Sequence, residues 1–154
     1  MSFVMHQGAR SFFRSALANP KFLMFDAYYC CLMAGLNARL LGVAEDLESD
    51  AFINGYPDDF RSQADIIAGL LLDAELDRKA IQPEDRASIE REMVKLVDPA
   101  SVTRLNAEGN KLLNMYAGAG FGLLQNAMLP PASVEDFLIA YHQFWHKESA
   151  SPVV

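Results

Sequence analysis

Two pairs of ionisable side chains are spaced so that each pair could share one face of a helix. Asp73 and Asp77 lie four residues apart in LLLDAELDRKA, and His142 and His146 are spaced alike near the end of the sequence. Paired carboxylates can perform acid–base chemistry, and paired imidazoles can bind zinc. However, the Glu-x-x-His pairs of a di-iron bundle and the general-base glutamate of a His-Glu-x-x-His motif are both missing. We therefore predict no catalytic residue, metal site or cofactor, and a solvated face for both pairs.

Three alternating glycines, Gly118, Gly120 and Gly122, form the most distinctive motif in the sequence. A phosphate-binding loop places such glycines between a strand and the start of a helix. Here a helical pattern, RLNAEGNKLLNMY, precedes them, and no strand does. Each glycine lowers helix stability by roughly 1 kcal/mol relative to alanine. We therefore interpret the cluster as a site of close helix packing or bending rather than of nucleotide binding.

Asp26 is unusual because it lies within a long apolar segment. A buried carboxylate needs a partner or a shifted pKa. Two interpretations stay open: a solvent-facing edge position, or a buried ion pair for which Arg104 is one candidate. The adjacent Cys30 and Cys31 are expected to be small core side chains, because neighbours in a helix point in different directions and do not readily form a disulfide.

Helical periodicity covers most of the chain, and strand alternation is absent. We predict an all-α, single-domain bundle of about five helices, with residues 1–148 in the domain and 149–154 as a flexible tail. A helix over 20–41, begun by Asn19-Pro20 and ended by Gly42, is apolar nearly all round, which is typical of a buried central helix. A short amphipathic segment over 3–18 precedes it, and further helices are expected over 58–81, 83–97, 102–127 and 133–147.

Composition narrows the class of protein. Hydrophobic residues make up 51% of the 154 residues, which is enough to form a core, and the formal net charge is -7. A surface of that sign disfavours direct binding to duplex DNA. The sequence does not begin with a secretory signal, and Asp26 and Arg39 disfavour insertion of the apolar helix into a membrane. We expect a cytoplasmic protein that does not associate with membranes.

Two segments resemble small helical accessory proteins of bacterial DNA-phosphorothioation (Dnd-type) defence operons. These are FLMFDAYYCCLMAGLNARLLG and RLNAEGNKLLNMYAGAGFGLL, together about a third of the chain. The resemblance implies a non-catalytic subunit beside an ATPase or nuclease of a phage-defence complex. The sequence departs from the family pattern by Ala119, which separates two glycines. The matching positions are Phe22, Phe25, Ala34 and Gly35 in the first segment, and Tyr116, Ala117, Gly118, Gly120 and Phe121 in the second.

We predict a non-catalytic helical subunit or adaptor of a multiprotein assembly. Alternatives are an acidic inhibitor or immunity-type protein that blocks a basic site, and an enzyme with an unrecognised carboxylate site around Asp26, Asp73 and Asp77. A homo-oligomer is also compatible with the sequence. Aromatic side chains are common at the centre of protein interfaces. The predicted partner-binding residues are therefore Tyr141, Phe144 and Trp145 on the last helix, together with Gly118, Gly120 and Gly122.

Overall fold

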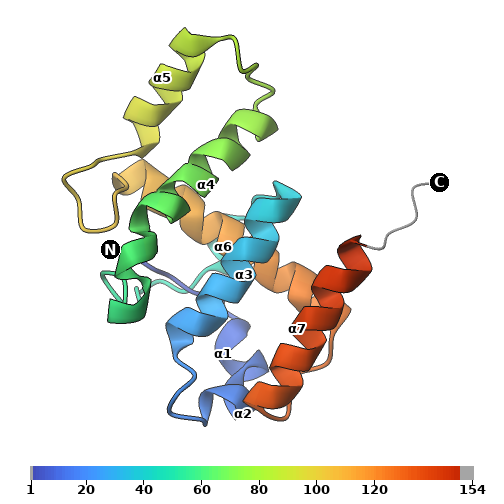
Figure 1. Ribbon diagram of the computed structural model, residues 1–154. Coiled ribbons are helices and arrows are strands. Elements are labelled where there is room, and N and C mark those ends of the chain that lie inside the picture. The colour runs from blue at the N-terminus through green and yellow to red at the C-terminus, as the bar shows by residue number, and fades with distance from the viewer. Residues whose placement is uncertain (1, 150–154) are drawn as a thin grey trace.

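The computed structural model describes residues 2–149, and helices joined by turns dominate this range (Figure 1). The prediction of an all-α bundle of about five helices is confirmed, because five of the helices are long. No helix among the described residues has the length and apolar character needed to cross a membrane. The long helices are α3 (Met24–Ala38), α4 (Ala64–Arg78), α5 (Arg86–Leu96), α6 (Ala107–Ala127) and α7 (Val134–Ser149). The short elements are α1 (Ala9–Phe12), α2 (Arg14–Leu17) and the 3₁₀ turns η1 (Ala44–Asp46) and η2 (Asp58–Gln63).

The centre of the molecule is the packing of α3 against α6 (Figure 1). Tyr28 on α3 and Tyr116 and Phe121 on α6 are fully buried or nearly so. Phe3, which precedes α1, adds its ring to the Phe25–Tyr28 pair with centroid separations of 5.1 and 5.4 Å. The core is therefore aromatic, and it joins the first residues of the chain to the two central helices.

The central helix α3 is shorter than the predicted helix over 20–41. Asn19 does not cap it; instead the Asn19 side chain accepts a hydrogen bond from the Lys21 amide (3.0 Å), which closes a tight turn before the helix. The Asp26 carboxylate accepts a hydrogen bond from the Leu23 amide (2.6 Å) and supports the true start. At the other end Arg39 adopts a left-handed conformation (φ 53°) and ends the helix before Gly42.

Residues 3–6 do not belong to a helix, in contrast to the amphipathic segment predicted over 3–18. They are extended and pair with residues 47–53 through isolated antiparallel bridges. The Phe3 amide donates to the Ile53 carbonyl (3.0 Å), and the Glu48 amide donates to the Met5 carbonyl (2.8 Å). Phe3, Val4 and Met5 are all buried. Tertiary contacts thus keep this segment extended, although its local sequence pattern resembles that of a helix.

Capping side chains set the remaining boundaries. Ser133 caps α7, since its hydroxyl accepts a hydrogen bond from the Asp136 amide (3.1 Å). Asn106 caps α6 by accepting from the Gly109 amide (2.9 Å), so this helix begins five residues later than predicted. α6 then continues through its glycines without a break, and α7 continues to Ser149. The predicted tail beyond Ser149 lies outside the described residues.

Candidate protein-binding surface

α4 and α5 form a hairpin that extends from the body of the molecule (Figure 1). α4 packs inward through Ala64, Ile67, Leu71 and Ala74, which are the apolar positions that the 3- and 4-residue spacing predicts for this helix. α5 buries only Leu96. Much of the hairpin surface is therefore available to solvent, and ionic contacts contribute to its attachment.

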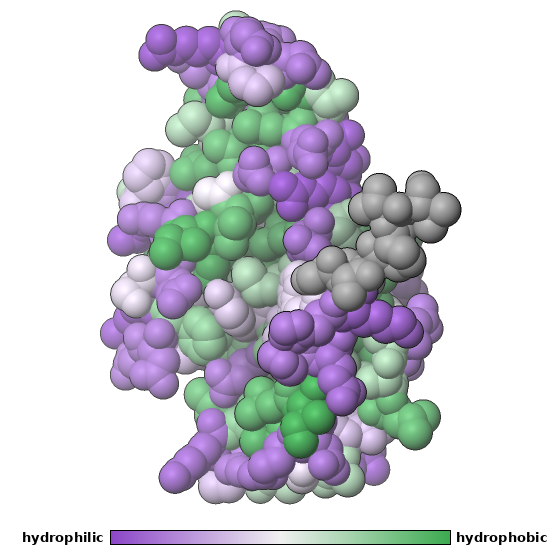
Figure 2. All heavy atoms as spheres, turned by 45° about the vertical axis from the view of Figure 1, so that its right-hand side comes forward, coloured by the Kyte–Doolittle hydropathy of each residue, from purple (hydrophilic) through white to green (hydrophobic). Residues whose placement is uncertain are grey.

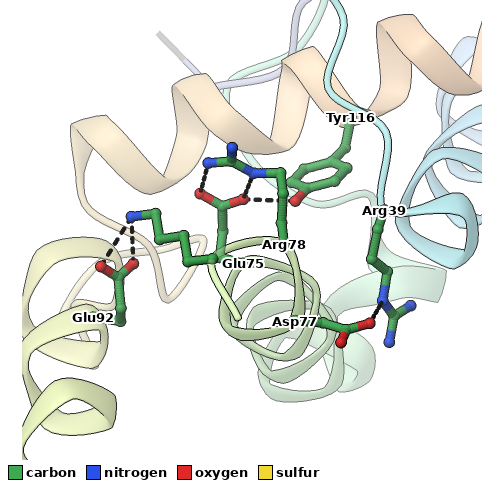
Figure 3. A network of polar contacts seen from close by, with 7 residues as sticks. Arg39, Glu75, Asp77, Arg78, Glu92 and Tyr116 are labelled. Carbon is green, nitrogen blue, oxygen red and sulfur yellow. Dashed lines mark hydrogen bonds and ion pairs between the residues drawn. The ribbon is translucent and has the colours of Figure 1, made fainter. Parts of the chain in front are cut away.

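A buried ionic network anchors α4 to α6 (Figure 3). Glu75 on α4 has no solvent exposure. Its carboxylate accepts a hydrogen bond from the Tyr116 hydroxyl (2.6 Å) and two from the Arg78 guanidinium (2.7 and 3.0 Å). A buried carboxylate without such partners would be strongly destabilising, so this arrangement fixes the orientation of α4 on α6.

The same contacts set the pKa values within the network. Burial alone would raise the pKa of Glu75, but the hydrogen bonds from Arg78 and Tyr116 outweigh burial and lower it. Burial and the neighbouring carboxylate raise the pKa of Tyr116. Glu75 is therefore ionised and Tyr116 is protonated at neutral pH. A carboxylate with three strong hydrogen bonds is suited to fixing two helices together, which is a structural role.

A second ion pair joins the two arms of the hairpin. Lys79, directly after α4, donates to both carboxylate oxygens of Glu92 on α5 at 2.9 Å (Figure 3). The two side chains are only 27% and 12% exposed, so this contact is more sheltered than an ordinary surface ion pair. The hairpin thus has fixed charges at its base and along its inner side.

The side of α4 that lies opposite its buried face is both apolar and acidic. We call it the α4 outer face; it comprises Asp65, Ile66, Gly69, Leu70, Asp73 and Asp77. Ile66 is 58% exposed and Leu70 is 38% exposed, although isoleucine and leucine are usually buried. α4 therefore has apolar side chains on both faces, which is typical of a helix covered on both sides.

A shallow apolar groove borders the α4 outer face on the side of α5. Its volume is about 400 Å³, and its walls include Ala68, Leu72, Met93 and Val97. Met93 in this wall is 44% exposed, and the next residue of α5, Val94, is 79% exposed. Apolar surface also follows directly below the polar tip of the hairpin in Figure 2. The α4 outer face and this groove form the candidate protein-binding surface.

Arginines from neighbouring segments balance part of the acidic charge on α4. Arg39 donates to Asp73 (2.7 Å) and to Asp77 (3.1 Å), and Arg104 contacts Asp65 (3.2 Å). The side chains of Asp73 and Asp77 remain 66% and 68% exposed, as expected for a solvated face. The sequence did not indicate that Arg39 bridges them, because that contact depends on how α3 ends beside α4.

Asp26 and Arg104 do not form the ion pair that was considered from the sequence. Asp26 bonds to the Leu23 amide at the start of α3, and Arg104 contacts Asp65 instead. Asp73 and Asp77 pair with Arg39, which follows the other end of α3. A helix of 15 residues spans about 22 Å. The three aspartates therefore do not come together in one catalytic site.

The three predicted glycines have different surroundings. A β-carbon on Gly120 would lie 1.6 Å from the Cys31 carbonyl oxygen, so this glycine permits the contact between α3 and α6. A β-carbon on Gly118 would lie 3.0 Å from Leu47, whereas one on Gly122 would meet nothing within 4 Å. Gly120 thus acts in helix packing within the chain, and its surface is not available to a partner.

The aromatic residues predicted to bind a partner line the inner side of α7. Tyr141 donates a hydrogen bond to the Cys30 carbonyl (3.2 Å) and packs on the buried Phe137 at 5.5 Å between ring centroids. Phe144 and Trp145 are partly buried against the core beside it. The exposed apolar residues of α7 are Leu138 and Ile139, at 51% and 59%. A partner-binding role for α7 stays a prediction.

His142 and His146 are exposed on α7, with ring centroids 4.0 Å apart. Within residues 2–149, no group of three or more histidine, cysteine, aspartate or glutamate side chains is arranged to hold a metal ion. Cys30 and Cys31 are both free thiols. Burial raises the pKa of Cys30 to about 12 and raises that of Cys31 as well, so both are protonated and poorly nucleophilic.

Comparison with protein-family models, with curated proteins and with solved structures gave no match. The candidate surface therefore depends on the geometry described above. Glu75, the most deeply buried charged residue among those described, was not among the residues singled out from the sequence. A signal was present: Glu75 follows Leu71 by four residues and Ala68 by seven, which places it on the buried side of α4.

Proposed function

We propose that this chain is a non-catalytic helical subunit or adaptor that acts by binding another protein. The observation that carries the proposal is the apolar outer face of α4, with Ile66 and Leu70 exposed opposite a fully packed inner face. Exposed apolar surface next to a groove is common at sites of protein association. The sheltered ionic contacts of Glu75 and Lys79 support the proposal, because they hold the hairpin in place before a partner binds.

The resemblance to Dnd-type accessory proteins adds an expectation about the partner. On that basis we propose an ATPase or nuclease of a phage-defence complex in the cytoplasm. The test is affinity purification of the chain at native expression, followed by mass spectrometry and size-exclusion chromatography with light scattering. We expect a stoichiometric protein partner. Elution of the chain alone, with no enriched protein, would contradict the proposal.

The acidic side chains of the α4 outer face support a second candidate function, namely an inhibitor that covers a basic site. Asp65, Asp73 and Asp77 lie on the same face as the exposed apolar residues. The two candidates differ in what binding does to the partner: an inhibitor abolishes the partner's activity, whereas a subunit is required for it. Assaying the recovered partner with and without this chain distinguishes them.

A further inference from the structure

We infer that the α4 outer face, together with its groove, binds a basic amphipathic helix of the partner protein. This inference rests on the proposed protein-binding function and specifies the surface and the chemistry of the partner. An amphipathic helix that docks in a groove uses apolar anchors spaced three and four residues apart. The exposed Ile66 and Leu70 are four residues apart, and Asp65 and Gly69 of the same face line the groove between α4 and α5.

The charge of this region favours a basic partner. Residues 58–77 contain six acidic residues and one basic residue. Arg39 and Arg104 reach the face from other segments, but the side chain of each aspartate they contact remains 66% exposed or more. The carboxylates therefore still offer oxygen atoms to lysine or arginine side chains flanking an apolar ridge. Complementary charge of this kind determines partner choice and orientation.

A second copy of the chain fits this surface less well. A symmetric dimer through α4 would place the same patch of both copies together, so the aspartates of one copy would face those of the other. Like charges across an interface oppose association. A basic helix instead gains from both components of the surface: its apolar ridge meets Ile66 and Leu70, and its charged flanks meet the aspartates.

Two designed peptides test the inference directly, in place of the natural partner. Both are model helices of about 18 residues, or five turns, with the same leucine face; one carries lysine at all other positions and the other carries glutamate. Each is titrated into the isotope-labelled full chain and followed by amide NMR. We expect the leucine–lysine helix to bind, with shift changes concentrated in α4 and α5 and affinity that falls as salt rises. The leucine–glutamate helix should not bind.

The chain provides a closely matched pair of control positions. Ile66 on α4 and Ile139 on α7 are 58% and 59% exposed, so Ile66→Gln and Ile139→Gln remove similar apolar surface from different helices. We expect Ile66→Gln to weaken binding of the leucine–lysine helix by about tenfold or more, as for loss of a well-buried side chain, and Ile139→Gln to leave it unchanged. Both variants should keep the wild-type melting temperature, because the side chains are exposed.

Several outcomes overturn the inference: no binding, equal binding of both probes, shift changes centred on α7 or on the acidic segment 45–50, or equal effects of the two glutamine variants. A dimer that Ile66→Gln dissociates would show instead that a second copy covers the face. The same variants separate this inference from the proposed function. A natural partner whose recovery is unaffected by Ile66→Gln refutes the surface but leaves the function standing, whereas absence of any partner refutes the function.

Discussion

Gly35 on α3 and Gly120 on α6 face each other where the two helices pack, and neither position has room for a β-carbon. A β-carbon on Gly35 would lie 1.9 Å from the Tyr116 carbonyl oxygen, and one on Gly120 would lie 2.8 Å from the Gly35 nitrogen. The backbones therefore touch directly at this point. The packing of α3 against α6 at this point requires glycine at both positions.

We predict that Gly120→Ala destabilises the fold and that Gly122→Ala stabilises it. The first substitution forces α3 and α6 apart, which costs at least about 1–3 kcal/mol. The second introduces a methyl group into open space and raises helix propensity, a gain of up to about 1 kcal/mol. Thermal unfolding of the two variants checks the contrast. Equal melting temperatures would show that the glycines are equivalent and that close packing does not explain the motif.

We predict that Glu75→Gln destabilises the protein by about 1–3 kcal/mol at neutral pH, because it removes the charge that Arg78 and Tyr116 satisfy. The pKa of Glu75 is lowered in the fold, since these hydrogen bonds outweigh the effect of burial. Its stabilising contribution is thus fully present above the ordinary pKa of about 4.3 and is lost as the pH falls through the lower folded-state value.

Melting temperatures of the wild type and Glu75→Gln, measured from pH 7 to pH 3, test this dependence. The difference between the two proteins should narrow towards acid pH. Asp73→Asn on the exposed side of the same helix is the control, and we expect only a small effect from it. A constant difference between wild type and Glu75→Gln across the range would contradict the role assigned to the ionised carboxylate.

We predict that Asn114→Ala releases residues 2–7 from the core. The Asn114 side chain accepts hydrogen bonds from the Val4 amide (3.1 Å) and the Tyr28 hydroxyl (2.7 Å), and donates one to the Ser2 carbonyl (2.9 Å). Removing this side chain leaves buried hydrogen-bond donors unpaired, which lowers the free energy of unfolding by about 1–3 kcal/mol. Hydrogen exchange should show reduced protection at Val4. Asn126→Ala, at an exposed position of α6, is the matched control and should change nothing in this segment.

We predict that Trp145→Ala lowers stability by about 1–3 kcal/mol, less than for a fully buried tryptophan, because the side chain is only partly buried against the core. Recovery of the partner by the folded protein should persist if α4 is the binding surface. His146→Ala, at the exposed neighbouring position, should have little effect on melting. Loss of the partner with an unchanged melting temperature would place the interface on α7 instead.

Periodicity predicted the helices well, because burial of one face of α4, α6 and α7 follows directly from apolar spacing. The ends of helices were harder to predict, as α3 shows, because more than one side chain near its start is of a capping type. Asn19 is a strong cap by type, yet it closes a turn with Lys21, and Asp26 supports the start of α3 three residues after Leu23. Local sequence does not show which of the two prevails.

The candidate surface was not predicted because it depends on which side of each helix is covered. The sequence showed Tyr141 and Trp145 as an aromatic face, but whether that face points inward depends on the placement of α7 against Cys30. Likewise, the spacing indicated the buried positions of α4, but it did not show whether another helix covers Ile66 and Leu70 on the opposite side. That distinction needs the positions of α3, α5 and α6.

Residues 3–6 pair with residues 47–53, and Asn114 holds Ser2 and Val4 in place by hydrogen bonds. This arrangement has a consequence for the synthesis of the chain. Residues 2–4 are synthesised before α6, and their hydrogen-bond partner on that helix is made about 110 residues later. Until then Phe3 and Met5 cannot reach their buried positions, and the growing chain exposes apolar side chains that attract chaperones or other nascent chains. Contacts of such long sequence separation also form slowly. The fold is therefore expected to close only after α6 has left the ribosome.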